Sequence, residues 1–425
     1  MILAFPGSNR SGRKHWRRKA FLVFCLVLPL AACFARSNSE AQWRSLYEAR
    51  QWFALRDAIK EAGVPPFYRG ATDAAFNQIR PAQKYLQAVI RAAPHSQDAY
   101  AAHELLASLY FRNGIYSKAF LQIEAMLTEK RTAEDVKNMR PLFQALSQSD
   151  QSVFRRRAST LPLRIEEGNL YLPFTIGGKQ ASYVLDTGAN FSLLSESEAN
   201  RLGLLIRNVN TEIGDSSGAH IGMRVAIAKD LLLGNLHLGN VAFGVLPDTQ
   251  PPFAGLPVGR RGLLGIPVLL AMRTVRWQPK GSFAFGFRPK PKHFQRANLC
   301  FEQSFPVTQV GFQHTELDFT LDTGAVHSIL SPPFAQRFPD LLKTSGQKEA
   351  HQLTGVGGSS SYESVLLPAV TLQVGGQAIS LKPAHVLLRQ SSDTSSWAAG
   401  NLGMDLLNQA STITIDFHAM MLSLQ

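Results

Sequence analysis

Two patterns of hydrophobic and polar positions divide the chain. Between residues 40 and 150, apolar residues recur at intervals of three and four, which is typical of amphipathic helices. The clearest face comprises Ala102, Leu105, Leu106, Leu109 and Tyr110. Asn113-Gly114 would end that helix, and a second apolar face then follows at Tyr116, Ala119, Phe120, Ile123 and Leu127. The pattern predicts an all-α N-terminal region, with degenerate helical neighbours of this pair over Arg44–Glu61 and Thr72–Ala92 and a capping helix over Thr132–Ser147.

From residue 160 onward the periodicity changes. Short runs of Val, Ile, Leu, Thr and Phe are separated by Gly, Pro and Asn, and such runs indicate strands. The second region is therefore predicted to be mainly β. The whole chain is expected to be multidomain, with parts at 1–32 (leader), 33–154 (helical), 160–288 (first β lobe), 289–299 (linker) and 300–425 (second β lobe).

The tripeptide Asp-Thr-Gly occurs in both predicted lobes, each time after an apolar run and before Ala. The copies are Asp186-Thr187-Gly188 and Asp322-Thr323-Gly324. Average residue usage predicts roughly 0.1 such tripeptides by accident in a chain of this length. Each copy precedes a Leu-Gly pair by a similar interval, 79 residues to Gly265 and 81 to Gly403. The C-terminal region is therefore interpreted as an internal duplication with an offset of 136 residues.

These paired motifs resemble those of the aspartic proteases, and the Ala after each Gly resembles the retropepsin branch. The resemblance covers about residues 160–425 and implies a bilobal fold with one Asp from each lobe. It also implies that the segments ending at Gly265 and Gly403 pass beneath the two turns, and that Thr187 and Thr323 cross-link them.

The residue types fit this chemistry. Two neighbouring Asp residues can share one proton, so that one acts as general base and the other as general acid on a water molecule. Asp186 and Asp322 are therefore the predicted catalytic residues, with Thr187, Gly188, Thr323 and Gly324 supporting them. A polypeptide substrate is expected, with no cofactor and no metal. The alternative is a non-catalytic lipoprotein that binds peptides or envelope proteins in the same groove.

Gly- and Ser-rich stretches lie between each motif and the later strands of its lobe. By the same resemblance they correspond to flap hairpins, and a flexible tip suits a lid that closes over substrate. Gly218, Gly357 and Tyr362 are candidate substrate-binding residues on this basis. For Tyr362 the plainer alternative is an ordinary strand residue.

The N-terminus has the character of an export signal. Six basic residues and no acidic ones precede residue 20, and an apolar run then ends at Leu30-Ala31-Ala32-Cys33. Thirteen apolar residues are too few to span a bilayer comfortably, which takes ~20. The ending resembles a bacterial lipoprotein box, which implies lipid on Cys33 and a periplasm-facing lipoprotein of the cell envelope. Phe34 after the cysteine suggests the outer membrane. An ordinary cleaved signal or a short uncleaved anchor are the alternatives.

The helical pair around Gly114 resembles one tetratricopeptide repeat, which implies a protein partner at this region. A plain helical spacer and a prodomain over the groove are the alternatives.

Removing the leader lowers the formal net charge from +13 to +7, which does not argue for nucleic acid. Because Cys33 would carry lipid, Cys300 would be the one remaining thiol, and no internal disulfide is expected. A zinc hydrolase is disfavoured, because His103-Glu104 lacks a second His at ligand spacing.

Overall fold

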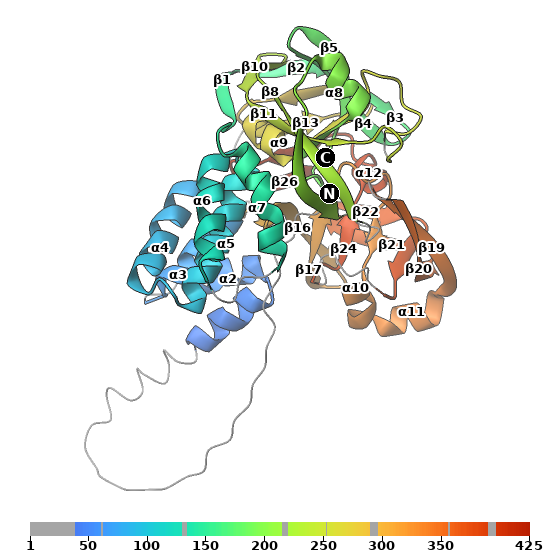
Figure 1. Cartoon of the computed structure of the whole chain (residues 1–425). Helices are drawn as coiled ribbons and strands as arrows, with labels where there is room; N and C mark the ends of the chain where they lie inside the picture. Colours follow the sequence, from blue (N-terminus) through green and yellow to red (C-terminus); the bar gives the residue numbers. More distant parts are fainter. Residues whose placement is uncertain are drawn as a thin grey trace, which may run out of the picture.

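The computed structural model describes residues 39–60, 63–129, 134–214, 220–251, 253–289, 296–355, 358–389 and 397–425. The leader and Cys33 lie outside these residues. Figure 1 shows a group of helices beside two β-rich lobes, with the first lobe above the second. Among the described residues, no helix has the length and apolar content needed to cross a bilayer.

Up to Leu146, the described part of the N-terminal region forms helices joined by short turns. Residues 39–48 form a first helix. The helices that follow are α2 (Trp52–Ala58), α3 (Pro66–Ala75), α4 (Ile79–Ala92), α5 (Gln97–Arg112), α6 (Tyr116–Leu127) and α7 (Glu134–Leu146). Ser96 caps α5 by accepting a hydrogen bond from the Ala99 amide at 3.0 Å. Gly114, at a φ of +71°, reverses the chain between α5 and α6 where the sequence predicted a helix end.

Two of the stretches predicted to be helical contain breaks. The stretch Thr72–Ala92 is not one helix, because Asn77 adopts a φ of +55° and ends α3 before α4 begins. Similarly, Arg44–Glu61 contains a break at Arg50, whose φ is +57°. Beyond α7, strand β1 begins at Ser152 and pairs with a strand of the first lobe, so residues 152–154 belong to a β-sheet.

The first lobe contains an eleven-stranded sheet and two short helices, α8 (Glu196–Leu202) and α9 (Ile266–Met272). In spatial order the strands are β1 (Ser152–Arg156), β10 (Leu236–Gly239), β9 (Leu231–Leu233), β4 (Asn169–Ile176), β5 (Lys179–Leu185), β12 (Gly262–Leu264), β6 (Ser192–Ser195), β11 (Val241–Leu246), β8 (His220–Ala228) and β7 (Arg207–Gly214), with β3 (Arg164–Glu166) beside β4.

The second lobe repeats this plan in a ten-stranded sheet with helices α10 (Pro332–Arg337), α11 (Pro339–Ser345) and α12 (Met404–Leu407). Its strands are β19 (Gln347–Gly355), β20 (Gly358–Leu367), β23 (Ala384–Leu387), β18 (Ile329–Leu330), β24 (Gly400–Leu402), β17 (Thr315–Leu321), β16 (Phe305–Phe312), β21 (Val370–Val374) and β22 (Gln377–Leu381), with β15 (Leu299–Glu302) beside β16.

The two lobes share equivalent strand pairings. β5 lies parallel to β12, and β17 lies parallel to β24. In each pair the first strand ends directly before an Asp-Thr-Gly turn and the second directly before a glycine, Gly265 or Gly403. The internal duplication read from the sequence therefore has its counterpart in the strand topology.

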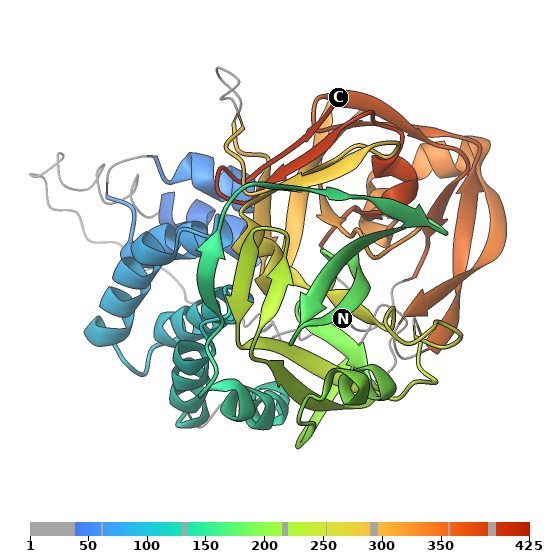
Figure 2. The same ribbon diagram turned by 90° about the horizontal axis from the view of Figure 1, so that it is seen from above.

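A third sheet joins the lobes. Its five strands are β2 (Ser159–Pro162), β14 (Ser282–Phe285), β13 (Thr274–Trp277), β25 (Ile413–Asp416) and β26 (Met421–Leu424). β13 comes from the first half of the duplication and β25 from the second, and they pair antiparallel from Thr274 to Trp277 (Figure 2). The lobes are thus connected by backbone hydrogen bonds, which fix their relative position.

The helical region packs against the second lobe through buried polar contacts. Arg112 of α5 is buried, donates to the Gln303 carbonyl, and places its guanidinium 4.8 Å from the Phe301 ring centroid. Glu302, also buried, accepts hydrogen bonds from Arg50 and from the Trp52 indole, the latter at 2.7 Å. The helices are therefore fixed to the start of the second lobe.

Candidate active site

Each Asp-Thr-Gly turn is held by the strand that runs beside it. The amide of Asp186 donates to the Leu264 carbonyl at 3.0 Å, and the amide of Asp322 donates to the Leu402 carbonyl at 2.9 Å. These bonds extend the parallel pairings β5–β12 and β17–β24 by one residue. The two Asp residues consequently occupy equivalent positions at the ends of buried strands.

The glycines after β12 and β24 allow the supporting chain to pass close beneath the turns. A Cβ added at Gly265 would lie 2.6 Å from the Ala189 carbonyl oxygen, and one at Gly403 would lie 2.7 Å from the His327 carbonyl carbon. Only glycine fits such an approach. The amide of Gly265 donates to the Ser192 hydroxyl at 3.0 Å, and that of Gly403 donates to the Ser328 hydroxyl at 2.8 Å.

The two threonines connect the turns across the lobes. The Thr187 amide donates to the Thr323 hydroxyl at 3.0 Å, and the Thr323 amide donates to the Thr187 hydroxyl at 2.9 Å. Each hydroxyl in turn donates to a carbonyl of the opposite lobe, Thr187 to Leu321 at 2.7 Å and Thr323 to Leu185 at 2.6 Å. Both threonines are fully buried, so this network is shielded from competing water.

Gly188 and Gly324 lie against the carboxylate of the opposite lobe. A Cβ at Gly188 would lie 2.5 Å from Cγ of Asp322, and one at Gly324 would lie 2.4 Å from Cγ of Asp186. The missing side chains therefore create the space in which the carboxyl groups approach one another. The two carboxyl groups consequently lie close enough for Asp322 to act on the protonation of Asp186.

The environments of the two carboxyl groups differ. Asp322 accepts hydrogen bonds from the amides of Gly324 and Ala325, at 2.9 and 3.1 Å, and from the Asn401 side chain at 3.4 Å. Asp186 accepts one from the Gly188 amide at 2.8 Å. Burial, followed by the charge of Asp322, raises the pKa of Asp186 to about 7. The pair is therefore arranged to hold one proton between its two carboxyl groups.

The structure also places the other predicted site residues. Gly218 and Gly357 lie outside the described residues, so their role in substrate binding stays a prediction. Tyr362 is half-buried in β20, opposite His351 of β19, and its contact with substrate stays a prediction.

Two serines of the site were missed from the sequence, and Asn401 was predicted only as part of the segment beneath the second turn. Ser192 and Ser328 each follow their Asp by six residues, so the internal repeat could have identified them. The contact of Asn401 with Asp322 could not be found in this way, because the counterpart of Asn401 in the first lobe is Leu263. Asn401 also accepts a hydrogen bond from the Thr320 hydroxyl at 2.6 Å, which orients its amide.

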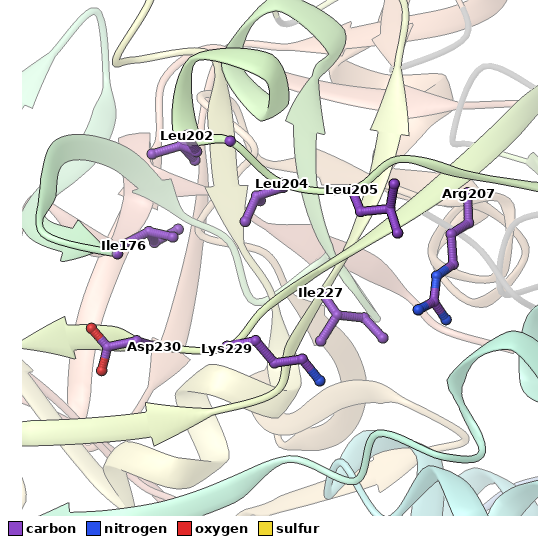
Figure 3. Close-up of a pocket in the computed structure, with 10 residues that line it drawn as sticks. Ile176, Leu202, Leu204, Leu205, Arg207, Ile227, Lys229 and Asp230 are labelled. Carbon is purple, nitrogen blue, oxygen red and sulfur yellow. The ribbon is translucent and has the colours of Figure 1, made fainter.

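A surface pocket of about 400 Å³ lies on the first lobe, apart from the two turns. Figure 3 shows Leu204, Leu205 and Ile227 between Asp230 at one end and Arg207 at the other. None of its lining residues belongs to either Asp-Thr-Gly turn or its support. The chemistry of the paired carboxyl groups is therefore not assigned to this pocket.

Comparison with known proteins adds a family likeness for part of the chain. Residues 172–268 match the aspartyl protease family. That segment contains the first Asp-Thr-Gly turn, the β7–β8 hairpin and the supporting glycine Gly265. No curated relative matches the chain.

Two solved structures are similar to shorter parts of it. One is a retropepsin-like aspartic protease from Rickettsia conorii, at 16% identity and a TM-score of 0.22, covering 32% of this chain and 93% of that one. The other is the EIAV protease in complex with the inhibitor HBY-793, at 26% identity and a TM-score of 0.19, covering 28% of this chain and 93% of that one.

Proposed function

We propose that this protein is an aspartic endopeptidase in which each lobe supplies one carboxyl group of the catalytic pair. The observation that carries the proposal is the close pair Asp186–Asp322, held in place by reciprocal bonds between Thr187 and Thr323. The aspartyl protease likeness of residues 172–268 supports the same reaction class.

The unequal environments assign the two roles. Asp322, with its amide donors, is the carboxylate that accepts a proton from water, while Asp186 is the protonated acid. The water oxygen bonds to the peptide carbonyl carbon as Asp186 gives its proton to the carbonyl oxygen. The C–N bond then breaks, the amine takes the proton held by Asp322, and Asp186 recovers one from the tetrahedral hydroxyl. Substrate atoms and catalytic protons balance over the cycle.

A peptide-library cleavage assay with matched variants tests this proposal. Asp322→Asn is nearly isosteric, and its amide can neither share the proton nor act as acid or base. We expect this variant, Asp186→Asn and the double variant to lose hydrolysis to a similar extent, because groups that act as a unit are non-additive. Circular dichroism checks that each variant is folded.

The alternative of a peptide-binding protein without catalysis predicts different results. Wild-type protein would then bind library peptides but cleave none between about pH 3 and 8. Cleavage by folded Asp322→Asn at the wild-type rate would instead rule out the carboxyl pair as the catalytic machinery.

We further propose that the mature protein is a lipoprotein of the bacterial outer membrane, anchored through Cys33 and facing the periplasm. The support is the basic leader, the apolar run and the ending Leu30-Ala31-Ala32-Cys33. Several acyl chains on one residue would suffice for stable attachment. Cys33→Ser is expected to release the protein from the membrane fraction or to block processing. Unchanged processing together with unchanged membrane retention would exclude lipidation.

The helical region is proposed to be a tetratricopeptide-like docking module for a protein partner. The side chains of Arg112, Trp52 and Phe111 contact the two β lobes. Leu121 of α6, in contrast, is 62% exposed and is available to a partner. A photo-crosslinking residue at Leu121 should yield one discrete adduct in the cell envelope. Failure to form such an adduct would favour the spacer interpretation.

A further inference from the structure

A group of metal-ligand side chains lies on the second lobe, at the base of the β19–β20 hairpin. It comprises Glu349 and His351 of β19 and His385 of β23. One ligand atom from each lies within 4.8 Å of those of the other two. His385 Nδ1 is 2.6 Å from Glu349 Oε1, and the two imidazole rings have centroids 4.3 Å apart.

The strand order explains how these residues meet. β20 lies between β19 and β23, and Ser364 of β20 pairs with Glu349 on one side and Leu387 on the other. Ser364 is small and buried, so the longer side chains of Glu349 and His385 can meet above it. His385 and Glu349 are each about 30% exposed, at 27% and 31%, which leaves the group open to an ion from solvent.

The fold itself does not require these residue types. By the matching strand registers, the first-lobe counterparts of Glu349, His351 and His385 are Thr211, Ile213 and Gly244. Thr211 is covered by α7 and donates to the Asn138 carbonyl at 3.0 Å. The second lobe thus carries two imidazoles and a carboxylate where the first lobe carries no comparable ligand.

We propose that Glu349, His351 and His385 form a binding site for a first-row transition-metal ion of the Zn²⁺ class. Two imidazole nitrogens and one carboxylate oxygen are a ligand set that such ions favour. A tetrahedral Zn²⁺ with bonds of about 2.0–2.1 Å holds its ligands roughly 3.3 Å apart, so small side-chain rotations close the site. Solvent supplies the remaining ligand.

The proposed metal site lies at the base of the β19–β20 hairpin. An ion bound there would link β19 to β23 across β20, and would therefore stabilise the base of the β19–β20 hairpin. His327, five residues after Asp322, is close enough to His351 to interact with it electrostatically. The site therefore lies near the segment that carries the second carboxyl group, yet shares no residue with the proposed catalytic pair.

The test measures metal binding by the full-length chain, purified without an affinity tag and freed of metal with a chelator. Zn²⁺ affinity is determined by competition with a chromogenic chelator, and Co²⁺ serves as a spectroscopic probe. We expect one Zn²⁺ per chain and a visible Co²⁺ absorption band. His351→Gln, His385→Gln and Glu349→Gln should each weaken binding by about 10–100-fold or more.

His237→Gln provides a matched control. His237 is bonded to Asp230 at 2.5 Å and is 32% exposed, so it forms a similar imidazole–carboxylate pair, but it is not part of the three-residue group found among the described residues. This variant should bind like wild type. Absence of a Zn²⁺ site in wild-type protein, or wild-type affinity in the three folded ligand variants, would overturn the proposal. Because the readout is binding, it is independent of whether the protein is a peptidase.

Discussion

Thr187 and Thr323, 136 residues apart, each accept a hydrogen bond from the backbone amide of the other. Each hydroxyl also donates to the strand that leads into the opposite turn. The position of one carboxyl group is therefore set by the lobe that carries the other. This reciprocity makes the site sensitive to changes that leave either lobe intact by itself.

Thr323→Val tests that dependence. The variant keeps the shape of the side chain but leaves the Leu185 carbonyl and the Thr187 amide without their buried partners. Each unsatisfied group costs about 1–3 kcal/mol. We expect lower stability in chemical denaturation and a marked loss of peptide hydrolysis. Thr323→Ser retains the hydroxyl and is the control; equal stability of the Val and Ser variants would contradict the role of the network.

Gly188→Ala should disturb the carboxyl pair directly, because the new Cβ would lie 2.5 Å from Cγ of Asp322. Displacing a catalytic group by about 1 Å can cost on the order of 100-fold in rate. We therefore expect kcat for a cleaved peptide to fall by about that factor. Gly281→Ala is the control, since its Cβ meets chiefly the flexible Gln278 side chain. Wild-type kcat in Gly188→Ala would show that the close approach does not position Asp322.

Activity and stability should both depend on the proton of Asp186. Because burial and the Asp322 charge raise its pKa to about 7, activity should fall as pH rises through about 7 and the acid is lost. A kcat/KM profile measures this limit.

The raised pKa of Asp186 also makes the stability of the folded state depend on pH. The folded pKa lies above the unfolded value of 3.8, so the folded state binds the proton more tightly, and its stability declines as pH rises from about 4 to about 7. Asp186→Asn removes that decline. The Tm difference between Asp186→Asn and wild type should therefore be more positive at pH 8 than at pH 5. An equal difference at both pH values would contradict the assignment of the proton to Asp186.

The contact between Trp52 and Glu302 should stabilise the attachment of the helices to the second lobe. Trp52→Phe removes the indole donor at 2.7 Å from a buried carboxylate, and hydrogen bonds to charged groups contribute about 1.5–3 kcal/mol. Trp43→Phe, which loses a 3.3 Å bond to the neutral Ala58 carbonyl, is the matched control and should cost less. Urea denaturation compares the two. A larger loss in Trp43→Phe would argue against an important role for the Glu302 contact.

Much of the site was accessible from the sequence because it is duplicated. Two copies of Asp-Thr-Gly at similar distances from a Leu-Gly pair predict two equivalent turns, and the serines six residues after each Asp follow the same repeat. Helix limits such as Ser96 and Gly114 are likewise local, since capping and left-handed geometry depend on neighbouring residues.

Other features depend on residues that only the tertiary structure brings together. The break at Asn77 was not predicted, because asparagine can also occur within a helix. Here its side chain accepts hydrogen bonds from Arg112 of α5 and from Asn113, the residue after that helix. The Asn401 contact to Asp322 distinguishes two carboxyl groups whose local sequences are nearly the same. The group of Glu349, His351 and His385 has no recognisable spacing along the chain, since its members lie on strands separated by β20. The repeat thus determined which residues form the turns, whereas sheet order and packing between lobes decided how their charges and neighbours differ.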